Sequence, residues 1–294
     1  MNVREQFSWL LEDDKIIVAP GCYDVVSAKI IENLGFKCAY LGGYTIGAVL
    51  GTTEPLTTLD ETVRFASYIT SRINIPLIVD GNAGFGDATH VTRAVREFER
   101  AGVTAIHIED QVFPKRAHYH LDRKYVIPMD EMVEKIRFAV QARQDENFHI
   151  IARTDARDAE NAGGIEEAID RANAYVEAGA TIAMPYGSAI PDLEEAQDAI
   201  RSINAPVLLI YSEGKVGRPT PTVSQYERIG CKIVIYNITA LLLAAKSTRK
   251  VYSRLMRTGS PRLDLNEMGR IRKDLEEAIG LPDLYRIEKN TRKS

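Results

Sequence analysis

The feature that most constrains the fold of this chain is an alternation of short apolar runs with segments of helical spacing, repeated eight times along 294 residues. The runs are rich in Ile, Val, Leu and small residues and carry few polar side chains, which is typical of strands that are covered on both faces. The predicted strands are 16–19, 38–41, 76–79, 105–108, 149–152, 181–184, 206–210 and 232–235.

The segments between these runs predict amphipathic helices. Residues 90–101, 130–143 and 165–178 carry apolar side chains three and four positions apart. Glycines that stop a helix shortly before the next strand stand at positions 35, 102, 179 and 230. Eight strand and helix units predict an α/β fold, a (β/α)8 TIM barrel. A doubly wound open sheet allows the same alternation, but it needs no count of eight and usually has a glycine-rich phosphate loop after its first strand, which 21–24 (GCYD) is not.

No low-complexity linker divides the chain, so we expect one barrel domain over residues 1–294. Within it, residues 238–294 form an extension beyond the eighth strand. Residues 238–257 predict a long helix, and the charged segment 263–292 predicts further helix. An extension of this kind usually packs on a neighbour, which favours a homo-oligomer.

The composition excludes several classes of function. A net charge of −4 provides no basic field for nucleic acid. The three cysteines are widely spaced and form no metal-binding pattern, which favours a reduced, cytoplasmic protein. The N-terminal segment has no apolar signal region, and no run of about 18 apolar residues occurs, so we expect no membrane partner. A small-molecule substrate is favoured.

Polar side chains follow several predicted strands at the point where each strand ends. They are Asp80, Asn82, Glu109, Asp110, Arg153, Asp155 and Glu213. In a parallel barrel these strand ends share the rim that carries the active site. Asp80, Asn82 and Glu109 offer hard oxygen donors suited to a Mg²⁺ ion that keeps several waters, with Mn²⁺ as an alternative. The competing interpretation is that these acids only cap helices or pair with Lys and Arg.

Two further features indicate an anionic ligand. Arg153 presents a planar fork that matches a carboxylate or phosphate. The connection 112–125 is longer than a barrel turn requires, and long loops in compact domains are often lids. Its His118 and His120 are candidate proton-transfer groups, with a plain surface role as the alternative, whereas His90 and His149 start elements and are expected to be structural.

These residues resemble the isocitrate lyase and phosphoenolpyruvate mutase superfamily, and most closely its short 2-methylisocitrate lyase-like branch. The similarity extends over about 20–259. Its most specific stretches are 40–44 (YLGGY), 79–86 (VDGNAGFG), 108–111 (IEDQ), 114–116 (PKR) and 152–156 (ARTDA).

The resemblance implies a barrel whose last helix is exchanged between subunits of a homodimer or homotetramer, with magnesium bound mainly through water. It also implies that small 2-oxo or 2-hydroxy acids are the substrates. Positions 80, 82 and 109 would organise the metal shell. The substrate would be held by Tyr40, Gly42, Gly43, Tyr44, Arg153 and Tyr211, and the catalytic group would comprise Lys115, Arg116, His118, His120, Arg153 and Glu213.

The sequence also departs from the lyase pattern. Alanine stands at position 117, where lyases carry a lid cysteine that acts as the acid, and His118 or His120 could replace it. Gly42 stands in place of a serine, Asn82 of an aspartate and Tyr186 of a glutamate. A magnesium-dependent carbon–carbon lyase is the leading hypothesis. An oxaloacetate decarboxylase-like enzyme, a carbon–phosphorus enzyme and a degenerate ligand-binding member are the alternatives.

Overall fold

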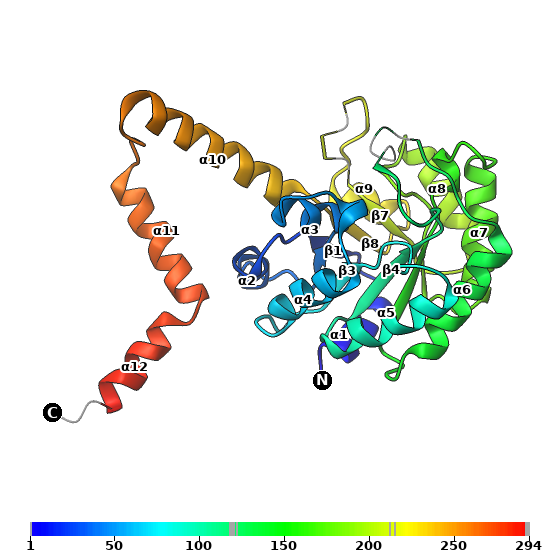
Figure 1. The fold of residues 1–294 in the computed structure, drawn as a ribbon, viewed down its shortest axis with the longest axis horizontal. Helices are drawn as coiled ribbons and strands as arrows, with labels where there is room; N and C mark the ends of the chain where they lie inside the picture. The colour runs from blue at the N-terminus through cyan, green and yellow to red at the C-terminus, as the bar shows by residue number, and fades with distance from the viewer. Residues whose placement is uncertain (1, 118–120, 122, 212, 215, 292–294) are drawn as a thin grey trace.

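In the described residues, eight parallel strands form the centre of the molecule (Figure 1). The computed structural model describes residues 2–117, 121, 123–211, 213–214 and 216–291. The strands are β1 Ile17–Pro20, β2 Ala39–Leu41, β3 Leu77–Asp80, β4 Ala105–Glu109, β5 His149–Arg153, β6 Ile182–Met184, β7 Leu208–Ile210 and β8 Ile233–Tyr236. All eight predicted strands are confirmed, with boundaries that differ by at most two residues.

The strands close into a barrel. Strands β2 to β6 pair in chain order, and β1 pairs with β8, which pairs with β7. Parallel bridges from Gly21 to Tyr40 and from Ala183 to Val207 join these two groups. The predicted (β/α)8 barrel is therefore confirmed, and the open-sheet alternative is excluded because an open sheet leaves two edges unpaired.

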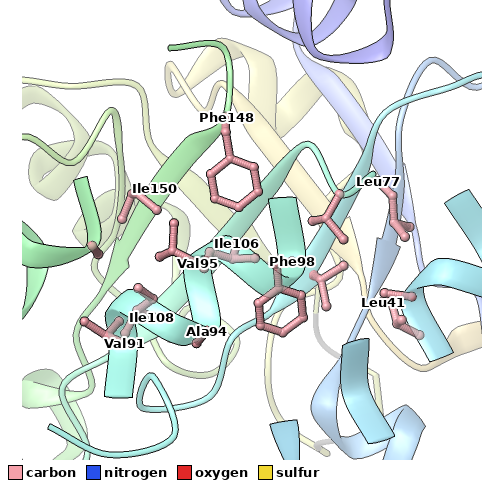
Figure 2. Packing of buried hydrophobic residues seen from close by; sticks show 14 of the residues in the cluster. Leu41, Leu77, Val91, Ala94, Val95, Phe98, Ile106, Ile108, Phe148 and Ile150 are labelled. Carbon is pink, nitrogen blue, oxygen red and sulfur yellow. The ribbon is translucent and has the colours of Figure 1, made fainter. Parts of the chain in front are cut away.

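Helices surround the barrel and precede its first strand. They are α1 Val3–Glu12, α2 Val25–Asn33, α3 Gly43–Val49, η1 Glu54–Leu56, α4 Leu59–Thr70, α5 Ala88–Arg100, α6 Met129–Ala142, η3 Ala156–Asp158, α7 Ile165–Glu177, α8 Leu193–Ser202, α9 Val223–Arg228, α10 Thr239–Thr258, α11 Leu265–Ala278 and α12 Leu281–Thr291. Figure 2 shows the packing of α5, which directs its apolar side chains onto the outer faces of β4 and β5.

The alternation of side chains along the strands separates the interior from the outer layer. Ile78, Ala105 and Ile151 belong to the cluster inside the barrel, whereas Ile106 and Ile150 pack outward against the helices. Because successive strand residues point to opposite faces, the polar residues that lie two or four positions beyond these inward residues also point inward. The polar residues at the strand ends therefore form the upper layer of the barrel interior.

The C-terminal helices extend away from the barrel (Figure 1). Helix α10 ends at Thr258 and is followed by Gly259, whose φ of 69° is the left-handed conformation that glycine adopts without strain. No residue of α10, α11 or α12 is buried in the described chain, although α11 approaches α2. In the described residues, none of the helices combines the length and the apolar character that crossing a membrane requires.

Candidate active site

Asp80 ends β3 at the mouth of the barrel. Its carboxylate accepts hydrogen bonds from the backbone N–H of Asn82 at 2.9 Å and of Gly43 at 3.1 Å. The neighbouring His107 places Nδ1 3.6 Å from Asp80 Oδ1, and its Nε2 lies 2.8 Å from the hydroxyl of Tyr40. Register explains the contact, because Asp80 and His107 are paired positions of β3 and β4. Asp80 is thereby fixed by backbone donors on two sides.

Glu109 ends β4 beside two cations. Its Oε1 lies 2.9 Å from Lys115 Nζ, and its Oε2 lies 3.0 Å from Arg153 Nη1. Arg153 is the register partner of Glu109 on β5, which brings the guanidinium to this carboxylate. Lys115 comes from the lid segment and also pairs with Glu54 of η1. Lys115 is only 4% exposed, so this end of the lid is anchored inside the site.

A second buried network holds Arg153 from behind. Asp155 Oδ2 lies 3.0 Å from Arg153 Nη2 and accepts a hydrogen bond of 2.6 Å from Gln111, while its Oδ1 accepts one of 2.9 Å from Lys124. Asp110 supports this layer, because its Oδ1 accepts the backbone N–H of Asp155 at 2.9 Å. Asp155 therefore orients Arg153.

Burial and neighbouring charges give the acids of the site different pKa values. Burial raises the pKa of Asp80, but the neighbouring His107, Lys115 and Arg153 lower it more, to about 2. Burial raises the pKa of Glu109 to about 7, although Arg153 and Lys115 oppose the shift. Burial lowers the pKa of His107 to about 4, so its imidazole is neutral. Asp80 is thus a permanent anion, whereas Glu109 can exchange a proton near neutrality.

The donor set fits a magnesium ion that is held mainly through water. The described part of the site buries five carboxylates, Glu54, Asp80, Glu109, Asp110 and Asp155, against four cations, Lys115, Lys124, Arg153 and Arg171. Among the described residues no three His, Cys, Asp or Glu side chains form a direct metal cluster. Asp80 stays ionised at the mouth of the barrel, and one ionised carboxylate with water ligands is an arrangement that Mg²⁺ prefers.

The other predicted metal residues are engaged within the protein. Asn82 has a φ of 53°, and its side-chain oxygen accepts the backbone N–H of Ala83 at 2.7 Å. Glu109 is paired with Lys115 and Arg153, so both residues would contact a metal through water. The assignment of Asp80, Asn82 and Glu109 to the metal shell stays a prediction.

The remaining predicted residues are distributed around the rim. Tyr40 is buried in the barrel, Tyr44 is 40% exposed on α3, and Arg116 is exposed on the lid. Tyr211 stacks on Tyr236 with ring centroids 4.6 Å apart. Glu213 is placed at the start of α10, where it accepts the backbone N–H groups of Ile238 at 2.7 Å and Thr239 at 2.9 Å. His118 and His120 lie outside the described residues.

Three site residues escaped the sequence interpretation. His107 could have been predicted from the alternation of side chains along a strand, because it lies two positions before the inward-facing Glu109 on the same strand. Glu54 and Lys124 lie in connections where no periodicity indicates direction. Only their burial, at 3% exposure each, identifies them as part of the site.

Comparison with known proteins identifies the family. A sequence profile described as Phosphoenolpyruvate phosphomutase matches residues 7–256. The chain belongs to the phosphoenolpyruvate phosphomutase family. It is 42% identical to a 2-methylisocitrate lyase of Aeropyrum pernix over 276 residues, which cover 93% of this chain and 86% of that protein.

Solved structures with a similar fold agree with this assignment. An oxaloacetate acetylhydrolase in complex with the inhibitor 3,3-difluorooxalacetate superposes with a TM-score of 0.89 at 31% identity, covering 98% of this chain and 97% of that one. A phosphonopyruvate hydrolase complex with oxalate and Mg²⁺ gives a TM-score of 0.84 at 27% identity and covers the whole of both chains. The predicted superfamily is confirmed, and the chain is an enzyme of this superfamily.

Proposed function

We propose that this enzyme is a magnesium-dependent carbon–carbon lyase that cleaves a small 2-hydroxy or 2-oxo di- or tricarboxylate through an enolate-like intermediate. The observation that carries the proposal is the convergence of Asp80, Glu109, Lys115 and Arg153 in one buried cluster at the mouth of the barrel. Such a cluster can hold a divalent cation and an anionic substrate together. The similarity to a 2-methylisocitrate lyase supports the choice of a lyase.

The residues of the site have separate roles in this proposal. Asp80 is ionised and would hold Mg²⁺ directly or through water, with Asn82 and Glu109 in the surrounding water shell. Mn²⁺ could occupy the same donors. When bound, the ion supplies Lewis-acid stabilisation of negative charge on the oxo-acid half of the substrate.

Arg153 would bind the substrate carboxylate. It is held by Glu109, Asp155 and the Gly187 carbonyl, which accepts from Nη2 at 3.1 Å, so its fork is oriented before the ligand arrives. The backbone at Gly42 and Gly43 would face the same carboxylate. Lys115 joins the lid to Glu109, so it would exclude water and strengthen these charge interactions when substrate is enclosed.

The departing enolate must receive a proton. The lid position that carries the acid in the lyase pattern is Ala117, which has no titratable group. We therefore propose that His118 or His120 donates this proton, with Arg116 assisting from the lid.

The product distribution tests the proposal. Purified protein with Mg²⁺, incubated with a panel of 2-hydroxy di- and tricarboxylates, should release a 2-oxo acid and a second carboxylic acid in equal amounts. The same incubations with a chelator should release neither. Absence of turnover by folded, metal-bound protein across the panel would contradict the proposal.

A second candidate is cleavage of an oxaloacetate-like diacid. The structural similarity to an oxaloacetate acetylhydrolase favours keeping it. Hydrolysis of oxaloacetate yields oxalate and acetate, whereas decarboxylation yields pyruvate and carbon dioxide without a second organic acid. The products from oxaloacetate alone distinguish these two reactions from each other, and the hydroxy-acid panel distinguishes both from the lyase.

We also propose that the enzyme is a homodimer or homotetramer in which α10 is exchanged. An apolar groove of about 620 Å³ lies between β1, α2 and the first turns of α10, lined by residues such as Val18, Ile30, Leu34 and Leu243. A closed barrel packs the helix that follows its last strand against this side, but here α10 extends away (Figure 1). In the proposed oligomer, helix α10 of a second copy would occupy this groove.

A further inference from the structure

The backbone of Asn237, which directly follows β8, is held against Gly21. The backbone N–H of Gly21 donates to the carbonyl of Tyr236 at 2.7 Å. A Cβ atom added to Gly21 would lie only 2.0 Å from the Asn237 carbonyl oxygen, so the two backbones are in direct contact. This close approach requires glycine at position 21 and fixes where the Asn237 side chain begins.

From there the Asn237 carboxamide reaches Gly42. A Cβ atom added to Gly42 would lie 2.2 Å from Asn237 Oδ1 and 3.1 Å from a ring carbon of Tyr40. Asn237 therefore occupies the space that a side chain at position 42 would need. The next residue, Gly43, donates its backbone N–H to Asp80 Oδ2 at 3.1 Å. The carboxamide thus lies one residue along the chain from the contact with the Asp80 carboxylate.

Asn237 Oδ1 is buried, yet among the described residues it accepts no hydrogen bond. A buried acceptor without a donor is costly, and such atoms often mark ligand contacts. A 2-hydroxy acid carries a hydroxyl donor, whereas a 2-oxo acid and oxalate carry only acceptors. The missing partner is therefore a hydrogen-bond donor, which 2-hydroxy acids have and 2-oxo acids lack.

We propose that Asn237 is a specificity-determining residue that accepts a hydrogen bond from the hydroxyl group of a 2-hydroxy acid bound between Gly42 and Asp80. The proposal rests on the proposed function and narrows its substrate class to hydroxy acids. The absence of a side chain at Gly42 is the matching feature, because it leaves the carboxamide oxygen facing the bound hydroxyl.

Calorimetry of two probes tests this role. Malate, a 2-hydroxy dicarboxylate, and oxalate, which has no hydroxyl, are titrated into the protein with saturating Mg²⁺. Asn237→Ala should weaken malate binding about tenfold and change oxalate binding by less than about twofold, since one neutral hydrogen bond is lost. Asn237→Asp keeps the acceptor oxygen, and its added charge weakens both anions alike, so the ratio of the two affinities should stay near that of the unaltered enzyme.

Each other outcome contradicts the assignment. Equal weakening of both probes by Asn237→Ala indicates a merely structural side chain, and no change indicates no contact. A larger loss for oxalate indicates that the carboxamide donates to a carboxylate instead. These results leave the proposed function intact, whereas failure of the unaltered protein to bind oxalate contradicts the proposed function and this role together.

A second pair of variants tests the shared space. Gly42→Ala should lower stability when Asn237 is present, because the new Cβ collides with Oδ1, and the loss should largely disappear in the Gly42→Ala, Asn237→Ala double variant. Urea denaturation measures both. An equal loss in the two backgrounds would show that the two side chains do not compete for one space.

Discussion

Replacement of Lys115 by methionine is the most informative perturbation of the buried cluster. The substitution keeps most of the apolar volume of the side chain but removes the charge that Glu54 and Glu109 share. Removing one partner of a buried ion pair costs about 3–5 kcal/mol when the other partner remains charged. In metal-free protein at pH 8.5 we expect a smaller loss of about 2 kcal/mol, because Glu109 takes up a proton instead of remaining an unpaired charge.

The loss of stability should depend on pH, because Glu109 takes up or releases a proton. Its folded pKa of about 7 already exceeds the ordinary value of 4.5, so the folded protein holds this proton up to about pH 7, and stability falls as pH rises from 4.5 to 7. Without Lys115 the pKa of Glu109 rises further. The stability of the variant therefore keeps falling above pH 7, where the stability of the unaltered protein levels off. The difference between the two proteins should therefore be small at pH 5.5 and should grow by about 1.4 kcal/mol for each pH unit above 7, until the new pKa is reached.

Urea denaturation in the presence of a chelator measures this difference, and Lys124→Met is the matched control. Lys124 is also a buried lysine, but its partner Asp155 retains Arg153 and Gln111, and these cationic and hydrogen-bonding neighbours hold the pKa of that carboxyl far below its usual range despite burial. The stability loss caused by Lys124→Met should be the same at pH 5.5 and 8.5. An equally flat response of Lys115→Met would refute the reasoning about Glu109.

Three further predictions concern the anion clamp, acid stability and assembly. Arg153→Lys should lower kcat/KM by about 100-fold without changing the circular dichroism spectrum, because lysine cannot bind Glu109, Asp155 and a ligand at once; near-normal kinetics would exclude the clamp. Burial lowers the pKa of His149 to about 4, so its neutral form stabilises the fold above pH 6.5 and this contribution is lost as pH falls toward 4. His149→Gln should remove about 1.4 kcal/mol per pH unit of that acid slope in urea denaturation, and an unchanged slope would contradict it. Leu243→Asp in the apolar groove should shift light-scattering mass toward the monomer, and an unchanged mass would argue against exchange of α10.

The fold was predictable because its determinants are local and periodic. Near-continuous apolar runs such as 149–152 indicate strands that are buried on both faces, and glycines such as Gly102 and Gly179, with φ of 77° and 110°, end helices where the sequence predicts. Asp80, Glu109 and Arg153 were identifiable for the same reason, since each is the last residue of its strand and the alternation of side chains along the strand sets the face to which it points.

The rest of the site depends on connections that have no period. Glu54 reaches Lys115 only because α3 and η1 fold back over the rim. Lys124 lies at the far end of the lid, yet it contacts Asp155. The close approach of Asn237 to Gly42 joins β8 to β2, and neither residue carries a sequence signal of the contact. Glu213 follows a strand like the other acids, but its carboxylate binds the start of α10.

A time course of carbon–carbon cleavage followed by NMR tests the proposed lyase activity most directly. The unaltered enzyme with Mg²⁺ and a 2-hydroxy di- or tricarboxylate should produce a 2-oxo acid and a second carboxylate at equal rates, and a chelator or Arg153→Ala should stop both. Turnover that survives chelation, or a folded enzyme that binds Mg²⁺ and oxalate but cleaves no member of the panel, would contradict the proposed lyase.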